Sequence, residues 1–251
     1  MPASERSLKA EGVVLRHQEY GEADRLLTVY TREQGKLRLM AKGVRRLRSR
    51  KAGHLEPFTR VQLLLARGKE MWLVTQADTV DAYLPLRDDL VKTGYAAYVM
   101  ELVDRFSYDE GANRGIYSLL VDTLERISTA EDIFLPVRYY EIRLLDLVGF
   151  RPELFQCVKC GKEIVAEDQF FSAEQGGALC PRCGIHQSGT QAITMPALKY
   201  FRHLQRSTYA EALRAQITPA VRAEMERLIH FYLTYILERG LNAPEFLRQV
   251  R

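Results

Sequence analysis

The chain has 251 residues, of which 47% are hydrophobic and 27% are charged. A chain of this size and composition can bury one large core or two modest ones, which excludes a disordered or collagen-like protein. No run reaches the roughly 18–20 uncharged residues that a membrane-spanning helix needs. Charged residues within the first twelve positions also argue against a secretory signal, so we expect a cytosolic protein.

The formal net charge of +4 is unevenly distributed along the chain. Residues 1–82 contain 16 Lys and Arg against 10 Asp and Glu, whereas residues 83–251 contain 20 against 22. A net charge this small does not indicate a binding partner, but the positions of the basic residues along the chain can. The basic excess lies in the first third of the chain.

Between about residues 9 and 83, turn-forming residues separate five short segments that have the character of β-strands. These segments are Gly12–Arg16, Arg25–Thr31, Lys36–Ala41, Phe58–Leu65 and Met71–Ala82. Five short strands in about 75 residues predict a small closed barrel, and the oligonucleotide-binding (OB) barrel is the commonest five-stranded kind.

After Pro85 the hydrophobic residues recur at steps of three and four, which predicts amphipathic helices. We expect helices from about residue 91 to 106, over 113–127, from 128 to 148 and from 219 to 240. Ser128 and Glu131 have the spacing of a capping box, and Pro136 marks either the true first turn or a kink. Thr218 and Pro219 are typical of a helix start.

The expected fold class is therefore α+β, with an N-terminal five-stranded OB-type barrel followed by a mainly helical domain. We place the barrel in residues 1–83 and the helical domain in residues 84–251. A Gly- and Cys-rich stretch at about residues 153–192 lacks helical periodicity, and it predicts a zinc-ribbon-like insert within the helical domain.

The four cysteines form two C-x-x-C-G knuckles, Cys157–Cys160 and Cys180–Cys183, separated by 19 residues. Two thiolates three positions apart in a tight turn can reach one tetrahedral ion, and the following glycine lets the turn fold back. This spacing predicts one structural Zn²⁺ held by four thiolates. The alternatives are free thiols, disulfides, or His186 in place of one cysteine.

A second candidate site is the segment of residues 36–51, which carries eight basic residues and no acidic residue. These residues are Lys36, Arg38, Lys42, Arg45, Arg46, Arg48, Arg50 and Lys51. Gly43 and Ser49 suggest a mobile loop after the third strand, suited to following a phosphate backbone and not to reading bases. The alternative is an ordinary solvated face.

Five aromatic residues near the barrel could stack on unpaired bases, although each is more often a core residue. They are Tyr20, Tyr30, Phe58, Trp72 and Tyr83. Glu22 and Asp24 could be imagined as a metal-binding pair, but a turn explains them without chemistry. The histidines have no partner pattern, and no hydrolase, Walker or metalloprotease motif occurs, so we expect no enzyme.

Several stretches together resemble the RecO family of bacterial DNA repair and recombination mediators. The most specific are Tyr20–Arg25 (YGEADR), Leu27–Thr31, Gln34–Lys36 and Ala41–Arg46 (AKGVRR), followed by Ser49–Arg50. Supporting matches are Leu55–Phe58, Arg143–Phe150 and the two cysteine knuckles. These matches span most of the chain in the order that the family has them.

The resemblance implies an OB domain, a helical domain and a zinc-ribbon-like insert in which zinc supports the fold. It also implies a non-enzymatic role in the cytoplasm, at the nucleoid during repair. Members bind single- and double-stranded DNA, anneal complementary strands and work with RecR to replace single-stranded-DNA-binding protein (SSB) with the RecA recombinase.

Carried over to this sequence, the family's basic loop falls on Lys42, Arg45, Arg46 and Arg50, and its metal positions fall on the four cysteines. The resemblance further implies a pocket for the SSB tail in the helical domain. Two other functions remain open: an RNA- or ribosome-associated OB and zinc-ribbon protein, and a zinc-dependent nuclease.

Overall fold

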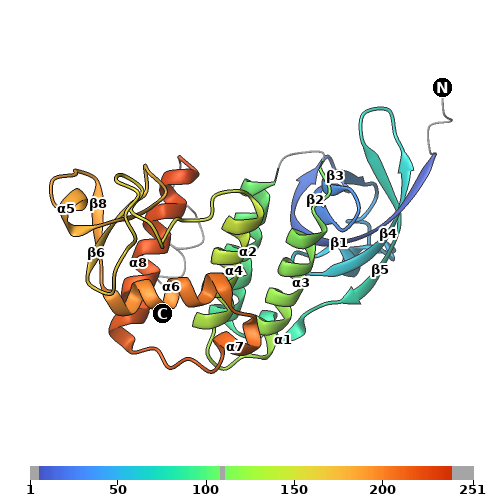
Figure 1. Cartoon of the computed structure of the whole chain (residues 1–251). Coiled ribbons are helices and arrows are strands. Elements are labelled where there is room, and N and C mark those ends of the chain that lie inside the picture. The colour runs from blue at the N-terminus through green and yellow to red at the C-terminus, as the bar shows by residue number, and fades with distance from the viewer. Residues whose placement is uncertain (1–5, 108–110, 239–251) are drawn as a thin grey trace. The chain divides into compact units, whose positions relative to one another are not determined.

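The computed structural model describes residues 6–107 and 111–238 and divides the chain into two compact units. The first unit extends to Glu131, and the second begins at Asp132. The first unit contains the barrel and the helices that follow it, and the second contains the cysteine-rich insert (Figure 1). Within the described residues, no helix is long and apolar enough to cross a membrane.

The first unit is built on a closed barrel with the strand order β1-β2-β3-β5-β4. Its strands are β1 (Ser7–Tyr20), β2 (Asp24–Thr31), β3 (Gly35–Ala41), β4 (Arg60–Arg67) and β5 (Trp72–Asp81). Neighbouring strands pair antiparallel except for β3 and β5, which pair parallel. The predicted five-stranded OB-type barrel is therefore confirmed.

The strand β1 is 14 residues long, far longer than the predicted Gly12–Arg16. Its first half pairs with β4 and its second half with β2, and a bulge between Val14 and Arg16 lets it turn from one partner to the other. Because the outer parts of β1 are mostly polar, their sequence lacks the apolar alternation that marks a half-buried strand.

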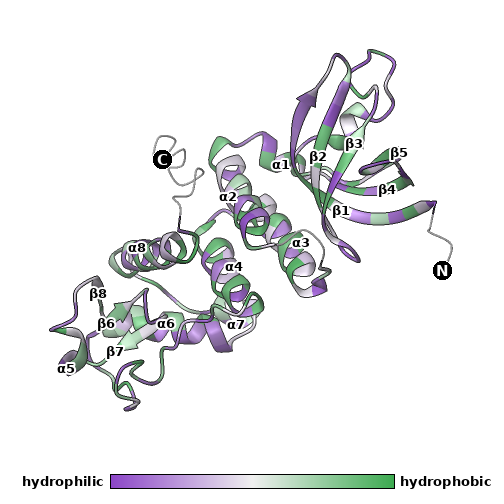
Figure 2. Ribbon diagram, turned by 90° about the horizontal axis from the view of Figure 1, so that it is seen from above, coloured by the Kyte–Doolittle hydropathy of each residue, from purple (hydrophilic) through white to green (hydrophobic). Residues whose placement is uncertain are grey.

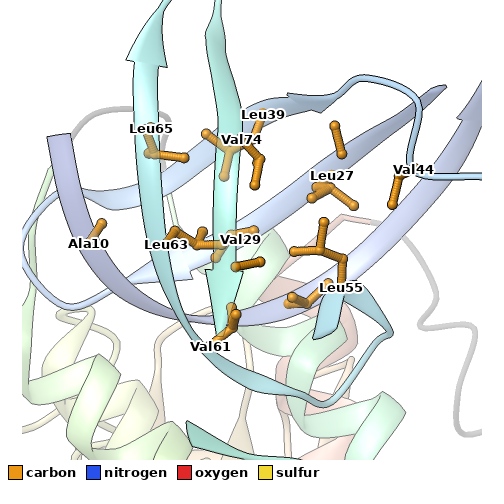
Figure 3. Packing of buried hydrophobic residues seen from close by; sticks show 13 residues of the cluster. Ala10, Leu27, Val29, Leu39, Val44, Leu55, Val61, Leu63, Leu65 and Val74 are labelled. Atoms are coloured by element: carbon orange, nitrogen blue, oxygen red, sulfur yellow. The ribbon is translucent and has the colours of Figure 1, made fainter. Parts of the chain in front are cut away.

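The barrel core consists of side chains that alternate along the strands, as the residues Leu37, Leu39 and Ala41 of β3 do. Hydrophobic and hydrophilic residues accordingly interleave along the strands in Figure 2. Figure 3 shows the packed cluster, with Val44 and Leu55 on the same side as Leu27. Both residues lie outside the strands, so the connection between β3 and β4 contributes to the core.

Within its described residues, the first unit also contains three helices and a short 3-10 helix. They are η1 (Ala52–Leu55), α1 (Leu84–Arg87), α2 (Leu90–Phe106) and α3 (Arg114–Thr129). The predicted apolar stripe of α2 is buried, including Tyr95, Val99 and Leu102. Helix α3 is fixed to β1 because the Tyr117 hydroxyl donates to the Glu11 carboxylate at 2.8 Å.

The second unit packs helices with a small three-stranded sheet of order β7-β6-β8. Its elements are α4 (Phe134–Leu147), β6 (Gln169–Ser172), β7 (Gly177–Leu179), α5 (Pro181–Gly184), β8 (Thr190–Ile193), α6 (Met195–Arg206), α7 (Tyr209–Ala212) and α8 (Pro219–Ile236). Thr218 caps α8 and Pro219 occupies its first turn, as predicted. The predicted helix end at Gly240 lies outside the described residues.

The capping box predicted at Ser128 is wrong, because α3 continues through Thr129. The next helix, α4, begins at Phe134, so Pro136 lies in its first turn, which confirms the first of the two alternatives. A capping box does occur at α7, where Thr208 and Glu211 exchange hydrogen bonds. A Ser or Thr followed three positions later by Glu occurs at both places, so this pattern alone does not identify a helix start.

Replacing Gly35 by Ala should destabilise the first unit by about 3 kcal/mol. Gly35 has a φ of +68°, and a Cβ there would lie 2.3 Å from the carbonyl oxygen of Gly111. The matched control is Gly21→Ala, which has a φ of +57° and open space around the new Cβ, and should cost about 1 kcal/mol. Urea unfolding measures both, and equal losses would show that the contact with Gly111 does not matter.

Candidate nucleic-acid interface and metal centre

The basic residues after β3 lie on a folded connection, which we call the basic turn (residues 42–50). The Arg45 N–H donates to the Ala23 carbonyl at 2.9 Å, and the Ser49 N–H donates to the Arg46 carbonyl at 2.8 Å. Val44 is completely buried in the barrel core. The mobile loop expected from the sequence is instead a series of hydrogen-bonded turns held on the barrel.

Asp24 fixes the start of the basic turn. Its carboxylate accepts a hydrogen bond of 2.7 Å from the N–H of Gly43, whose φ of +63° suits glycine. The bond gives Asp24, the first residue of β2, a structural role, in agreement with the interpretation that needs no metal. The acidic turn between β1 and β2 therefore serves the geometry of the basic turn.

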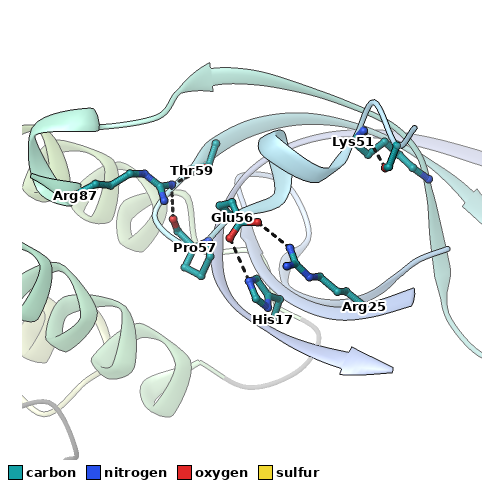
Figure 4. A network of polar contacts seen from close by, with 8 residues as sticks. His17, Arg25, Lys51, Glu56, Pro57, Thr59 and Arg87 are labelled. Atoms are coloured by element: carbon teal, nitrogen blue, oxygen red, sulfur yellow. Dashed lines mark hydrogen bonds and ion pairs between the residues drawn. The ribbon is translucent and has the colours of Figure 1, made fainter. Parts of the chain in front are cut away.

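The segment after the basic turn is anchored by a polar network around Glu56 (Figure 4). Glu56 accepts hydrogen bonds from Arg25 at 2.8 Å and from His17 at 3.3 Å. Burial alone would raise the pKa of Glu56, but the bonds from Arg25 and His17 lower it below its ordinary value. His17, which looked isolated in the sequence, thus has a carboxylate partner 39 residues away.

Several of the eight basic residues in 36–51 are engaged by the fold, among them Lys36, Arg45 and Lys51. Lys36 donates to the Asp104 carbonyl at 2.8 Å and lies 3.3 Å from the Asp104 carboxylate. Lys51 donates to the Val74 carbonyl at 2.8 Å, and burial lowers its pKa. Arg45 lies 3.1 Å from the Glu19 carboxylate. Lys51 and Arg45 thus hold the connection against the barrel, whereas Lys36 joins the start of β3 to α2. Arg38 is exposed on β3.

Four cations of the basic turn point into solvent: Lys42, Arg46, Arg48 and Arg50. Within the part of the chain that the structure describes, none of them lies within 4.0 Å of a carboxylate. Side chains of this kind can neutralise phosphates whatever the base sequence. The arrangement is therefore a preformed cationic surface on an OB-type barrel.

Most of the five aromatic candidates serve the fold. Tyr30 and Tyr83 are buried, and the guanidinium of Arg67 lies 5.1 Å from the ring centre of Trp72. Phe58 is half-buried beneath Arg87. Tyr20 differs, because 54% of its surface is exposed next to the turn between β1 and β2.

The four cysteines come together in the second unit as their spacing predicted. Their Sγ atoms all lie within 4.8 Å of one another, and those of Cys160 and Cys180 are 3.9 Å apart. Tetrahedral coordination with Zn–S bonds of about 2.3 Å requires sulfur separations of roughly 3.8 Å. The cluster can therefore hold a metal ion with all four coordination positions filled by thiolates.

Backbone hydrogen bonds and glycines shape the turn of each cysteine knuckle. In the first, the Cys157 N–H donates to the Lys162 carbonyl at 2.7 Å, and Gly161 turns the chain with a φ of +71°. In the second, glycine is needed for a different reason, because a Cβ on Gly184 would lie 2.4 Å from the ring of Phe170. The two knuckle glycines thus allow a turn in one case and close packing in the other.

The thiols of the cluster differ in pKa. Burial would raise the pKa of Cys157, but N–H groups of Cys180 and of the first knuckle lower it to about 6. Hydrogen bonding to Cys180 is the main cause that raises the pKa of Cys183 to about 12. A cation would relieve the repulsion among the thiolates. Among the described residues His186 is not part of this cluster.

Together these features define an OB-fold protein with a helical second unit and a four-cysteine metal-site geometry. The family model "Recombination protein O N terminal" matches residues 6–83, and "Recombination protein O C terminal" matches residues 87–245. The chain therefore belongs to the RecO family of DNA repair proteins.

Three similar proteins, each named DNA repair protein RecO, support this assignment. The protein from Roseiflexus sp. (strain RS-1) is 40% identical over 98% of this chain and 87% of its own length. One from Dehalococcoides mccartyi is 36% identical over 92% of this chain and 91% of its own length. One from Moorella thermoacetica is 34% identical over 96% of this chain and 91% of its own length.

Glu56→Gln should lower the free energy of unfolding by about 1 kcal/mol at pH 7, after allowance for solvent screening. Because folding lowers the pKa of Glu56, its stabilisation is present above the unfolded pKa of about 4.3 and is lost as the pH falls through the lower folded value. The difference between variant and wild type should therefore shrink below pH 4. Exposed Glu70→Gln is the control, and a constant difference from pH 7 to 3 would contradict the network.

Cys160→Ser should abolish retention of one zinc per chain after dialysis against a weak chelator, because three thiolates hold the ion less tightly than four. The thermal midpoint of the second unit should fall with it. His186→Ala is the matched control and should keep its zinc. Mass spectrometry of the metal content measures both variants. Zinc loss from His186→Ala, or full retention in Cys160→Ser, would contradict the four-cysteine assignment.

Proposed function

We propose that this protein is a recombination mediator that binds single- and double-stranded DNA without sequence specificity and anneals complementary strands. The observation that carries the proposal is the basic turn, on which Lys42, Arg46, Arg48 and Arg50 point into solvent from a hydrogen-bonded backbone. A preformed cationic surface binds phosphates with little loss of conformational entropy.

In this proposal Arg45 and Lys51 position the turn, Lys36 joins the start of β3 to α2, and Arg38 is a further exposed cation on β3. The four outward cations contact phosphates of either strand, because a phosphate backbone carries the same charge on both. Two complementary strands held in this way lose much of their mutual repulsion, and base pairing then supplies the specificity. Annealing needs no nucleophile or catalytic base, so we propose a binding protein and not an enzyme.

The proposed partners follow from membership of the family. With RecR, the protein would help to load RecA onto single-stranded DNA covered by SSB, and would contact the SSB C-terminal tail. Residues 1–83 would form the DNA-binding domain, and residues 84–251 the helical domain that contains the insert at 153–192. We propose that this domain holds one structural Zn²⁺ on Cys157, Cys160, Cys180 and Cys183. The ion would supply folding energy and no chemistry.

Changing Lys42, Arg46, Arg48 and Arg50 together to Ser should flatten the salt dependence of single-stranded DNA binding. At about 0.7 in the log–log slope per lost phosphate contact, the slope should fall by about 3. A fluorescence-anisotropy titration at several salt concentrations measures it. The same variant should anneal complementary strands more slowly.

The matched control removes four exposed cations of the second unit, by changing Lys162, Arg182, Lys199 and Arg214 to Ser. This control lowers the net charge equally but should leave the slope unchanged. An unchanged slope in the basic-turn variant would place the DNA elsewhere. Tighter binding of RNA than of DNA of the same sequence would favour the RNA-associated alternative.

A further inference from the structure

Leu47 occupies an unusual place for an apolar residue. Its side chain is fully exposed, at 107% of its reference area, whereas the other exposed large hydrophobic residues of the described chain reach at most 66%. It lies between Arg46 and Arg48, whose side chains also point into solvent. A single exposed leucine is common, but one at the centre of a cationic turn is placed where a polyanion would bind.

The backbone holds Leu47 in this exposed position. The hydrogen bond from the Ser49 N–H to the Arg46 carbonyl closes a β-turn in which Leu47 and Arg48 are the two central residues. The preceding turn is closed by the Arg46 N–H on the Gly43 carbonyl at 3.2 Å, and buried Val44 fixes it to the core. Leu47 therefore projects from a folded support.

Tyr20 is a second exposed residue with apolar surface, and it lies at the end of β1, just before the turn that adjoins the basic turn. The two turns are joined through Arg45, whose N–H donates to the Ala23 carbonyl at 2.9 Å and whose guanidinium lies 3.1 Å from the Glu19 carboxylate. Tyr20 as a whole residue is 54% exposed at the end of β1. Tyr20 thus follows directly on Glu19, the residue that meets Arg45, and Leu47 lies two residues after Arg45.

We propose that Leu47 and Tyr20 contact the faces of unpaired bases while the neighbouring arginines contact phosphates. Nucleobases offer flat, weakly hydrated faces on which aromatic and apolar side chains pack without regard to sequence. Such contacts select unpaired strands, because the faces of paired bases are covered by their stacked neighbours. The inference rests on the proposed function, since it assigns the part of that surface that distinguishes single strands from duplex.

The experiment compares Leu47→Ser and Tyr20→Ser with wild type, using a labelled oligothymidylate and a duplex of the same length at several salt concentrations. Each variant should bind the single strand about fivefold more weakly, with an unchanged salt slope, because an apolar contact releases no counterions. Duplex affinity should stay the same. Tyr20→Phe should retain the wild-type affinity, because it keeps the ring.

Leu90→Ser, at another exposed leucine of the same unit, is the matched control and should change nothing. Unchanged single-strand affinity in both variants, or an equal loss on duplex, would overturn the inference while leaving DNA binding by the basic turn intact. Failure of the wild type to bind either DNA would instead refute the proposed function. Loss of binding to a protein partner alone would assign Leu47 and Tyr20 to a protein interface and overturn base contact.

Discussion

The burial of Val44 and Leu55 in the barrel core is the constraint on which the candidate DNA surface depends. Val44 lies within the basic turn and Leu55 lies five residues after its end, so the connection is held to the barrel at two points. Burial of each of these side chains stabilises the fold by roughly 1.5–3 kcal/mol. By comparison, two cations about 10 Å apart in water repel each other by about 0.4 kcal/mol. Burial therefore outweighs the mutual repulsion of the exposed cations, and the turn stays folded without a polyanion.

Around this constraint, charged residues divide into two groups by their surroundings. Lys36 and Lys51 donate to main-chain carbonyls, and Arg25 meets Glu56, so these cations stabilise the frame. The cations at the turn surface keep their charge available to a ligand. In the metal-site geometry of the second unit, too, the backbone and two glycines help to bring four thiols together.

Local patterns predicted the parts of the structure that depend on local interactions. The barrel strands, the start of α8 and the cysteine cluster follow from alternation, capping and the C-x-x-C spacing. Local patterns did not predict the length of β1 or the partner of His17, because both depend on residues far away in the sequence. The order of the basic turn was missed for the same reason: Val44 and Asp24 fix it through contacts that composition does not reveal.

Hydrogen exchange of the backbone, with and without single-stranded DNA, tests the central claim most directly. The account predicts that the amides of Arg45 and Ser49, which are hydrogen-bonded in the turn, exchange slowly in the free protein. It also predicts further protection across residues 42–50 when DNA binds. Fast exchange throughout this segment in the free protein, or protection by DNA confined to the second unit, would contradict a preformed turn as the DNA surface.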